Sequence, residues 1–468
     1  MRLFLEPRYV DPESIDRRWE LHRDAGRLLR RIYVNPDSSS KSGRTPLSWA
    51  AGNSHEGVVR LLLGLKDVNP NSASGYGRTP LSWAAESGHE GVLKLLLSRE
   101  GINPDTSTES GRTPLSYAAS EGHESAVKLL LGSRHVNPNL LDSDGRPPLS
   151  YAAAGGHGSV VKLLVERPGI DPNSADSDGL TPLSYAAKWG RKDLVRRFLE
   201  HSGVSPDLPD NNNRTPLSYA AAEGHSDIVK LFLKRGDVNP DSSDSSGRTP
   251  LSYAAISGSE GVVKLFLDRG DVNLDSSDNS GRTPLSYAVS SEDEGVVKLF
   301  LERGDISPDL ADIEGRTPLS YAVSRGCEGV VELLLRRGDV NPNSLDRVGR
   351  PLLSHAATGG HGGVVRRLVE SPNIDPNLSD SDGITPLSYA AQWGREDLVQ
   401  LYLGRWGFNP DLPDHNHRTP LSYAASRGHE GVVKLLLGRR DVDPDSLDDN
   451  GLVVCCHFRG DGCGEATC

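Results

Sequence analysis

The motif Thr-Pro-Leu-Ser returns along this chain at a strict interval. Each copy begins 34 residues, or twice 34, after the one before it, and the two skipped registers hold altered copies that open at Pro147 and Pro351. Self-similarity at a fixed period of this length is the signature of a repeat architecture, in which one small supersecondary unit is stacked many times. The sequence therefore predicts twelve 34-residue units, which account for 408 of its 468 residues. The ten regular copies begin at Thr45, Thr79, Thr113, Thr181, Thr215, Thr249, Thr283, Thr317, Thr385 and Thr419.

Within one unit, the residue pattern predicts two short helices. Thr215 is a favourable N-cap, and Pro216 suits the first helical position, where a missing N–H has no consequence. Gly224 is expected to end this helix, and the apolar residues of 228–233 recur at the spacing of a second helix. Gly236 is expected to cap that second helix in the left-handed conformation. The Asp-rich segment that follows predicts an extended turn leading to the next unit.

A helix pair of this size cannot bury its own apolar side, so each unit depends on its neighbours for a core. The expected fold is a mainly α solenoid. Residues 41–452 are predicted to form the twelve repeats, residues 1–40 a degenerate N-terminal capping half-repeat, and residues 453–468 a Cys-rich irregular tail. A second periodicity lies above the first, because residues 146–244 match residues 350–448 at an offset of 204. This match indicates that a block of six repeats was duplicated.

The motif resembles the ankyrin repeat. The hallmark run of that family, Thr-Pro-Leu-His-x-Ala-Ala, then Gly-His, then Val-Val-x-Leu-Leu-Leu, recurs here with Ser in place of the His in every unit, from Ser48 to Ser422. The Ser hydroxyl is expected to bond nearby backbone groups instead. The resemblance implies an ankyrin-like solenoid of β-hairpin/helix-turn-helix repeats, with fingers projecting from stacked helix pairs around a concave surface. The long uniform array resembles those of filamentous fungi.

By the same resemblance, the expected function is a non-enzymatic scaffold or adaptor whose partners are other proteins. A rigid, preorganised surface loses little ordering entropy when it binds, so modest contacts give useful affinity. The alternative is the sensor or regulatory repeat region of a larger signalling protein, such as an NLR-like ATPase or a ubiquitin-ligase component.

The composition narrows the class of partner. The formal charge of −12 argues against nucleic acid, since such sites need a net basic surface. No apolar run approaches the ~18 residues of a membrane span, and no signal peptide is visible after Met1. Four of the five cysteines lie after residue 454, so no disulfide framework is predicted. The chain is expected to be cytoplasmic, or nuclear, without membrane attachment.

No catalytic, cofactor or metal site is predicted. The spacing of the cysteines after residue 454 fits no recognised zinc motif, and the Gly-His positions lie one repeat apart, too far for neighbouring rungs to chelate one ion. Ser116 and His123 recur as parts of the motif, without a third group to orient a catalytic dyad. No phosphate-binding Gly-x4-Gly-Lys-Ser/Thr loop occurs, and no small-molecule substrate is expected.

Three ladders of side chains run along the units. An Arg precedes most of the opening Thr residues, as Arg248 does, and an Asp often lies five positions before them, as Asp244 does. One interpretation is that these charges pair along the fingers, and another is that the arginines are donors for acidic partner segments. The residue after Thr-Pro-Leu-Ser is aromatic in eleven of twelve units, with His355 as the exception. Such a stripe predicts packing between repeats.

The strongest partner-binding candidates are Trp189 and Trp393. They lie near the end of the first helix, at a position that most other units fill with polar residues, and each is followed two residues later by an Arg, Arg191 or Arg395, where most units have His. Trp and Arg are enriched among interface hot spots. The competing interpretation is that the two Trp residues came with the block duplication and pack against a neighbouring finger. If both bind equivalent epitopes, the six-repeat spacing implies avidity.

Overall fold

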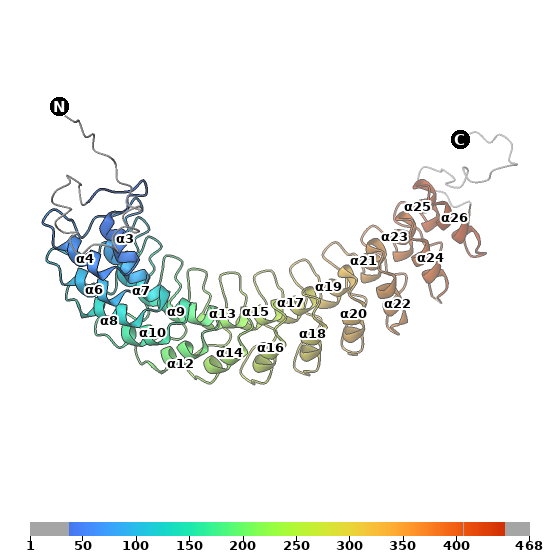
Figure 1. Ribbon diagram of the computed structural model, residues 1–468. Helices are drawn as coiled ribbons and strands as arrows, with labels where there is room; N and C mark the ends of the chain where they lie inside the picture. Colours follow the sequence, from blue (N-terminus) through green and yellow to red (C-terminus); the bar gives the residue numbers. More distant parts are fainter. Residues whose placement is uncertain (1–36, 406, 445–468) are drawn as a thin grey trace, which may run out of the picture. The chain divides into compact units, whose positions relative to one another are not determined.

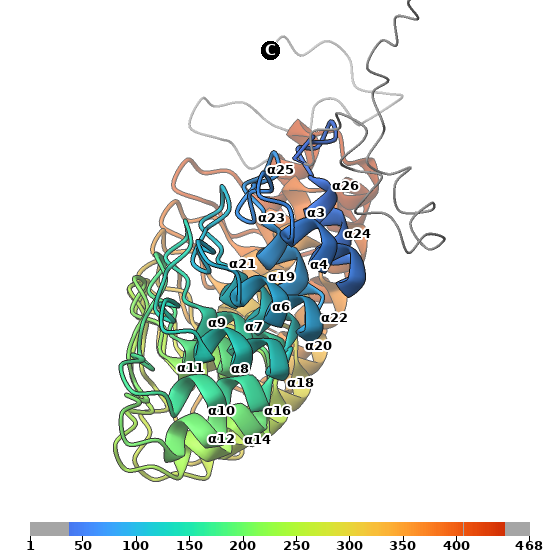
Figure 2. The same cartoon turned by 60° about the vertical axis from the view of Figure 1, so that its left-hand side comes forward.

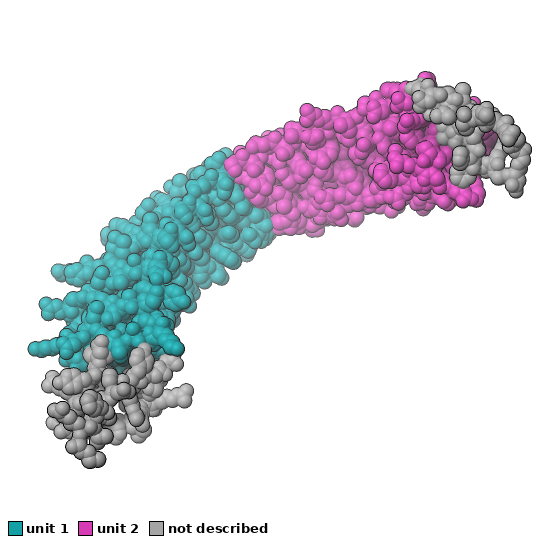
Figure 3. Space-filling view, turned by 90° about the horizontal axis from the view of Figure 1, so that it is seen from above, with its two compact units in different colours: residues 1–239 teal, residues 240–468 magenta. Residues whose placement is uncertain are grey.

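The computed structural model describes residues 37–405 and 407–444. These residues contain 24 helices, α3 to α26, in twelve consecutive pairs, and so the prediction of a mainly α array of twelve repeats is confirmed. The chain divides into two compact units, residues 1–239 (unit 1) and residues 240–468 (unit 2), with six helix pairs described in each (Figure 3). The predicted Cys-rich tail and nearly all of the predicted capping half-repeat lie outside the described residues.

In unit 1 the first helices of the pairs form one row, the second helices form another, and the long loops project beside the first-helix row (Figures 1 and 2). The first helices are α3 (Pro46–Gly52), α5 (Pro80–Glu86), α7 (Pro114–Glu121), α9 (Pro148–Gly155), α11 (Pro182–Lys188) and α13 (Pro216–Ala222). The second helices are α4 (Glu56–Leu63), α6 (Glu90–Leu97), α8 (Glu124–Gly132), α10 (Gly158–Val165), α12 (Lys192–Glu200) and α14 (Ser226–Leu233).

Unit 2 has the same two rows (Figure 1). Its first helices are α15 (Pro250–Ile256), α17 (Pro284–Ser290), α19 (Pro318–Arg325), α21 (Leu352–Gly359), α23 (Pro386–Gln392) and α25 (Pro420–Ser426). Its second helices are α16 (Glu260–Leu267), α18 (Glu294–Leu301), α20 (Glu328–Leu335), α22 (Gly362–Glu370), α24 (Glu396–Leu403) and α26 (Glu430–Leu437).

Each regular first helix starts at the predicted Thr-Pro pair. Thr215 is the N-cap of α13, and its hydroxyl accepts a hydrogen bond from the backbone N–H of Ser218 at 3.3 Å. The Ser218 hydroxyl lies 3.2 Å from the same Thr side-chain oxygen, whereas the expected bond to a backbone group occurs at Ser82, whose hydroxyl donates to the Thr79 carbonyl at 2.8 Å. At the two altered copies the N-cap is Pro, and the buried hydroxyls of Ser150 and Ser354 have no hydrogen-bond partner within the described part of the chain.

The two helices of a pair end differently. Gly224 follows α13 with a φ of 71°, in the left-handed region, as predicted. Gly236 lies outside that region, so the predicted left-handed cap of the second helix is wrong. The C-cap of α14, Lys234, keeps right-handed helical angles, and the N–H of Arg235 bonds the carbonyl of Phe232 at 3.0 Å. This tighter bond between residues three apart closes the helix without a residue of positive φ.

Alanine substitutions at these two glycines are therefore expected to have opposite effects. Gly236→Ala should stabilise its repeat by about 0.5 kcal/mol, because Ala restricts the unfolded chain more than Gly does, and a Cβ at this site meets nothing within 4 Å. Gly224→Ala should destabilise the same repeat by about 1 kcal/mol, because Ala is strained at positive φ. Urea unfolding followed by far-UV circular dichroism measures both changes. A loss of stability in Gly236→Ala would contradict the assignment of its backbone conformation.

The core lies between the two helix rows. Ala220 and Ala221 of α13 are fully buried, and so are Val229 and Phe232 of α14. The small alanine side chains let neighbouring first helices approach each other, and α11 contacts α13 directly. Because the inner pairs bury their apolar side chains against the pairs before and after them, stability depends on contacts between neighbouring repeats.

The fingers are turns rather than hairpins. In one finger the N–H of Asp142 bonds the carbonyl of Arg146 at 3.2 Å, and the N–H of Gly145 bonds the carbonyl of Asp142 at 3.0 Å. The Asp142 carboxylate also accepts the N–H of Arg146, at 2.8 Å, so this group is not available to a β-ladder. The described residues therefore contain no extended strands, and their one isolated β-bridge joins Leu345 to Pro351.

Candidate functional site

In many of the described repeats, one side chain bonds the exposed end of the first helix of the preceding repeat. In unit 1, Nε2 of His157 lies 2.8 Å from the Ser120 carbonyl of the preceding repeat. In unit 2, Nε2 of His429 lies 3.0 Å from the Gln392 carbonyl. These contacts bond carbonyl groups at helix ends that have no partner within their own helix, and they fix the spacing between neighbouring helix ends.

Arg191 takes the place of this histidine in the repeat of α11. Its Nε donates a hydrogen bond to the Ala154 carbonyl of the preceding repeat at 3.1 Å, and its side chain lies against Gly156. In unit 2, the Arg395 guanidinium lies against Gly360 in the same way, but its nitrogens have no hydrogen-bond partner within the described part of the chain. Arg191 therefore helps to fix the position of its repeat relative to the preceding one. The Arg395 side chain is exposed to solvent.

Trp189 and Trp393 are the C-cap residues of α11 and α23, and each residue is 56% exposed. The four residues predicted for partner binding thus lie at two helix ends, Trp189 and Arg191 in unit 1 and Trp393 and Arg395 in unit 2, with each Arg side chain directed to a glycine of the preceding repeat. An indole that is this exposed contributes little to the core, and it presents a large apolar face to a partner.

Each Trp belongs to a row of equivalent positions at the C-terminal ends of four consecutive first helices. Consecutive helices of each row contact one another, from α7 through α13 in unit 1 and from α19 through α25 in unit 2. The first Trp strip consists of Glu121, Gly155, Trp189 and Glu223. The second Trp strip consists of Arg325, Gly359, Trp393 and Arg427.

The arginines that precede the opening Thr residues pack mainly on aromatic rings. The Arg44 guanidinium lies 3.6 Å from the ring centroid of Trp49 and 3.8 Å from that of Trp83 in the next repeat. Pairing with the Asp ladder also occurs, as between Arg248 and Asp244 at 2.8 Å. Each cation–π contact contributes about 0.5–2 kcal/mol. This stacking was not predicted from the sequence, although the fixed spacing between Arg and the aromatic residue is compatible with it.

The aspartates of the fingers bond to the aromatic stripe. Asp210 is only 5% exposed, and its carboxylate accepts a hydrogen bond from the Tyr219 hydroxyl at 2.5 Å. Its other oxygen accepts the backbone N–H groups of Asn212 and Arg214, each at 2.8 Å. In an equivalent pair, burial and the hydrogen bond to aspartate raise the pKa of Tyr151 to about 12. The aromatic stripe is therefore part of a hydrogen-bond network within each of these repeats.

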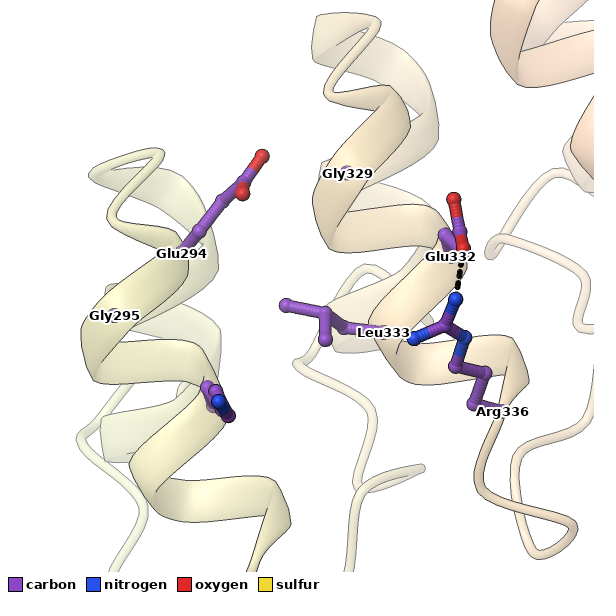
Figure 4. A pocket seen from close by; sticks show the side chains of 7 residues that line it. Glu294, Gly295, Gly329, Glu332, Leu333 and Arg336 are labelled. Atoms are coloured by element: carbon purple, nitrogen blue, oxygen red, sulfur yellow. Dashed lines mark hydrogen bonds and ion pairs between the residues drawn. The ribbon is translucent and has the colours of Figure 1, made fainter.

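A shallow pocket of about 330 Å³ lies between α18 and α20 (Figure 4). Its lining is charged, and Arg336 forms an ion pair with Glu332 at its edge. Among residues 37–405 and 407–444, no group of three or more His, Cys, Asp or Glu side chains could hold a metal ion. Over the same ranges, no helix is long and apolar enough to cross a membrane. The exposed Trp residues are thus the feature that best marks a candidate site.

Comparison with known proteins agrees with this architecture. A search of curated proteins gave no match. The family profile described as ankyrin repeats (3 copies) matches eight overlapping segments. These segments are residues 22–108, 100–176, 168–244, 236–312, 272–346, 304–380, 328–414 and 353–448. Ankyrin repeats are generally protein–protein interaction modules. Because the match covers most of the sequence and the helix pairs stack in the corresponding register, the chain belongs to the ankyrin repeat family.

Proposed function

We propose that this chain is a non-enzymatic scaffold or adaptor that binds other proteins through the two Trp strips. The observation that carries the proposal is the exposure of Trp189 and Trp393, each 56%, at helix ends held in register by contacts between repeats. Exposed Trp on a rigid support is the typical anchor of a protein interface, because it supplies a large contact area at little cost in conformational entropy.

The proposed mechanism is recognition by a preformed surface. The side chain of Arg191 and the ring of His225 each bond a carbonyl of the repeat before, so the helix ends around Trp189 are already ordered before a partner arrives. The conformational entropy lost on binding then comes mainly from the partner and not from this chain. We place this activity in the cytoplasm or nucleus, where the free thiol of Cys327 would stay reduced.

A comparison of pull-downs tests the proposal. The double variant Trp189→Ala, Trp393→Ala is expected to lose the partners that the unaltered chain retains from a cell lysate, with affinity lowered at least about tenfold, because truncation removes the central anchors. Its thermal unfolding midpoint should stay close to that of the unaltered chain, because both indoles are largely exposed. Quantitative mass spectrometry measures the capture, and far-UV circular dichroism measures the midpoint.

Tyr76→Ala is the matched control, because Tyr76 is an exposed aromatic residue, 71% accessible, on a finger rather than on a Trp strip. Capture by this variant should equal capture by the unaltered chain. Equal capture by the Trp double variant would refute the proposed site. A large fall in its unfolding midpoint would instead assign both Trp residues to packing between repeats.

A further inference from the structure

The two Trp strips share a framework and differ in charge. The first strip has Glu121 on one side of its Trp and Glu223 on the other. The equivalent positions of the second strip, 204 residues later, hold Arg325 and Arg427. All four charged side chains are exposed. The two exchanges change the charge of the strip from −2 to +2, while both strips retain their Trp and Gly.

The arginines of the second strip are available to a ligand. The side chain of Arg427, like that of Arg395, has no ion-pair partner within the described part of the chain. Arg325 lies 3.4 Å from Glu292, and both side chains are about half exposed, at 46% and 55%. An exposed pair of this kind is weak, so a better-placed carboxylate can replace Glu292.

Nearby glutamates do not cancel this positive charge. Glu328 and Glu396 belong to the second-helix row, where their carboxylates lie against Gly363 and Gly431 of the next repeats. Glu328 also pairs with Arg367 at 3.0 Å. Each of these carboxylates therefore contacts the second helix of the next repeat.

Helix stability does not account for the difference between the strips. A helix C-terminus carries a partial negative charge, which favours Arg and disfavours Glu. Arg325 and Arg427 agree with this preference, whereas Glu121 and Glu223 oppose it at equivalent helix ends. The glutamates of the first strip are thus electrostatically unfavourable for their own helices. This points to a role in selection between ligands.

We propose that the second Trp strip binds an acidic, extended segment of a partner protein, and that the first Trp strip excludes this segment. An apolar side chain of the partner would pack on Trp393, and its carboxylates would pair with the guanidinium forks of Arg325 and Arg427. Glu121 and Glu223 would repel the same carboxylates. This inference rests on the proposed function, and it means that the two strips are not equivalent epitopes.

The geometry also gives the spacing of the partner's residues. Neighbouring helices lie about 10 Å apart, which an extended chain spans in about three residues. Arg427 is one repeat from Trp393, and Arg325 is two repeats away on the other side. The partner segment therefore carries one acidic residue about three positions from the apolar residue, and another about six positions from it in the opposite direction.

Fluorescence anisotropy with synthetic peptides tests the proposal on the full chain. The probes are labelled peptides with one Trp in a Gly/Ser background, with Glu three positions to one side and six to the other, made in both chain directions. Matched peptides carry Lys instead of Glu. We expect the Glu peptides to bind one site and the Lys peptides to bind at least about tenfold more weakly. Trp393→Ala should abolish binding, and Trp189→Ala should not change it.

Charge exchanges between the strips provide the matched variants. Arg325→Glu with Arg427→Glu should weaken binding of the Glu peptides at least about tenfold, and Arg325→Gln with Arg427→Gln gives a milder test if the first variant folds poorly. Glu121→Arg with Glu223→Arg should raise the stoichiometry from one peptide to two, because the first strip then has the same charged neighbours.

The outcomes separate the two proposals. Equal binding of Glu and Lys peptides, or no binding of the Glu peptides, overturns the inference about charge. If Trp393→Ala abolishes binding but reversal of the arginines leaves it unchanged, charge selection fails and the interaction surface stands. If substitution of either Trp changes neither peptide binding nor lysate capture, the proposed function itself fails.

Discussion

Replacement of Asp210 by Ala is expected to destabilise its finger by about 3 kcal/mol, because three hydrogen bonds to one buried carboxylate disappear together. Tyr219 is only 6% exposed, and the substitution removes the carboxylate that accepts a hydrogen bond from its hydroxyl at 2.5 Å. It also removes the acceptor of the N–H groups of Asn212 and Arg214, which hold the turn closed. Hydrogen–deuterium exchange should be about a hundredfold faster for the amides of residues 208–220, since every 1.4 kcal/mol corresponds to a factor of ten.

Two milder variants test this explanation. Asp210→Asn keeps an oxygen acceptor for the backbone and should lose only about 1 kcal/mol, as should Tyr219→Phe, which removes one bond. A hydroxyl can also hold the equivalent turn, because Ser74 accepts the N–H of Arg78 at 3.3 Å in a repeat whose aromatic residue is Trp83. If Asp210→Ala and Asp210→Asn were equally stable, the carboxylate would not be the group that organises the finger.

The double variant Pro351→Thr, His355→Tyr is expected to stabilise the repeat of α21 by about 1 kcal/mol at neutral pH. Thr at 351 restores the N-cap and supplies a partner for the buried hydroxyl of Ser354, worth about 1 kcal/mol. Tyr at 355 replaces the existing contact between Nε2 of His355 and the Asp346 carboxylate, at 3.0 Å, with the hydroxyl bond that other repeats have, so it should add little stability at neutral pH. Hydrogen exchange in residues 346–370 measures the gain.

The same repeat should become less stable as the pH falls. Burial lowers the pKa of His355 below 6.5, with Arg350 acting in the same direction, although Asp346 opposes the shift. Below pH 6.5 the unfolded chain therefore binds a proton at His355 that the folded chain does not bind. The contribution of neutral His355 to the stability of the repeat is thus present above pH 6.5 and is lost as the pH falls through the folded pKa. His355→Tyr should remove this dependence between about pH 7 and pH 5.

Pro147→Thr is the control for the cap alone. Its repeat already has Tyr151 bonded to Asp142, and the buried hydroxyl of Ser150 lacks a partner among the described residues. We expect a gain of about 1 kcal/mol with no change in pH dependence. A pH response that persisted in the double variant at 351 and 355 would assign the titration to another group.

The elements that the sequence predicted are those that local chemistry sets. The Thr-Pro pair caps a helix through atoms within three residues, as the bond from the N–H of Ser218 to Thr215 shows. Gly224 adopts the left-handed conformation that ends α13, also as predicted. Since the period of 34 never slips, each local prediction recurs along the array, and the stacking of neighbouring pairs follows from their unburied apolar faces.

The predictions that failed, and the contacts that were missed, depend on neighbouring repeats or on competition for one donor. Gly236 was expected to cap a helix, but the bond from Arg235 to Phe232 already closes the end. The fingers were expected to resemble hairpins, but the Asp142 carboxylate takes the N–H that a β-ladder needs. Arg44 was seen as a charge on a finger, whereas stacking places it between two rings that are 34 residues apart.

The sequence by itself determined the number of repeats, the starts of the first helices and the two Trp residues that interrupt a polar position. Only the tertiary structure decided which side chains remain available to a partner. Arg191 and Arg395 are identical in the sequence pattern, yet one bonds the Ala154 carbonyl of its neighbour and the other has donors without a described partner. The physical reason is that exposure and hydrogen bonding are properties of stacked repeats, because each repeat completes the surroundings of the next.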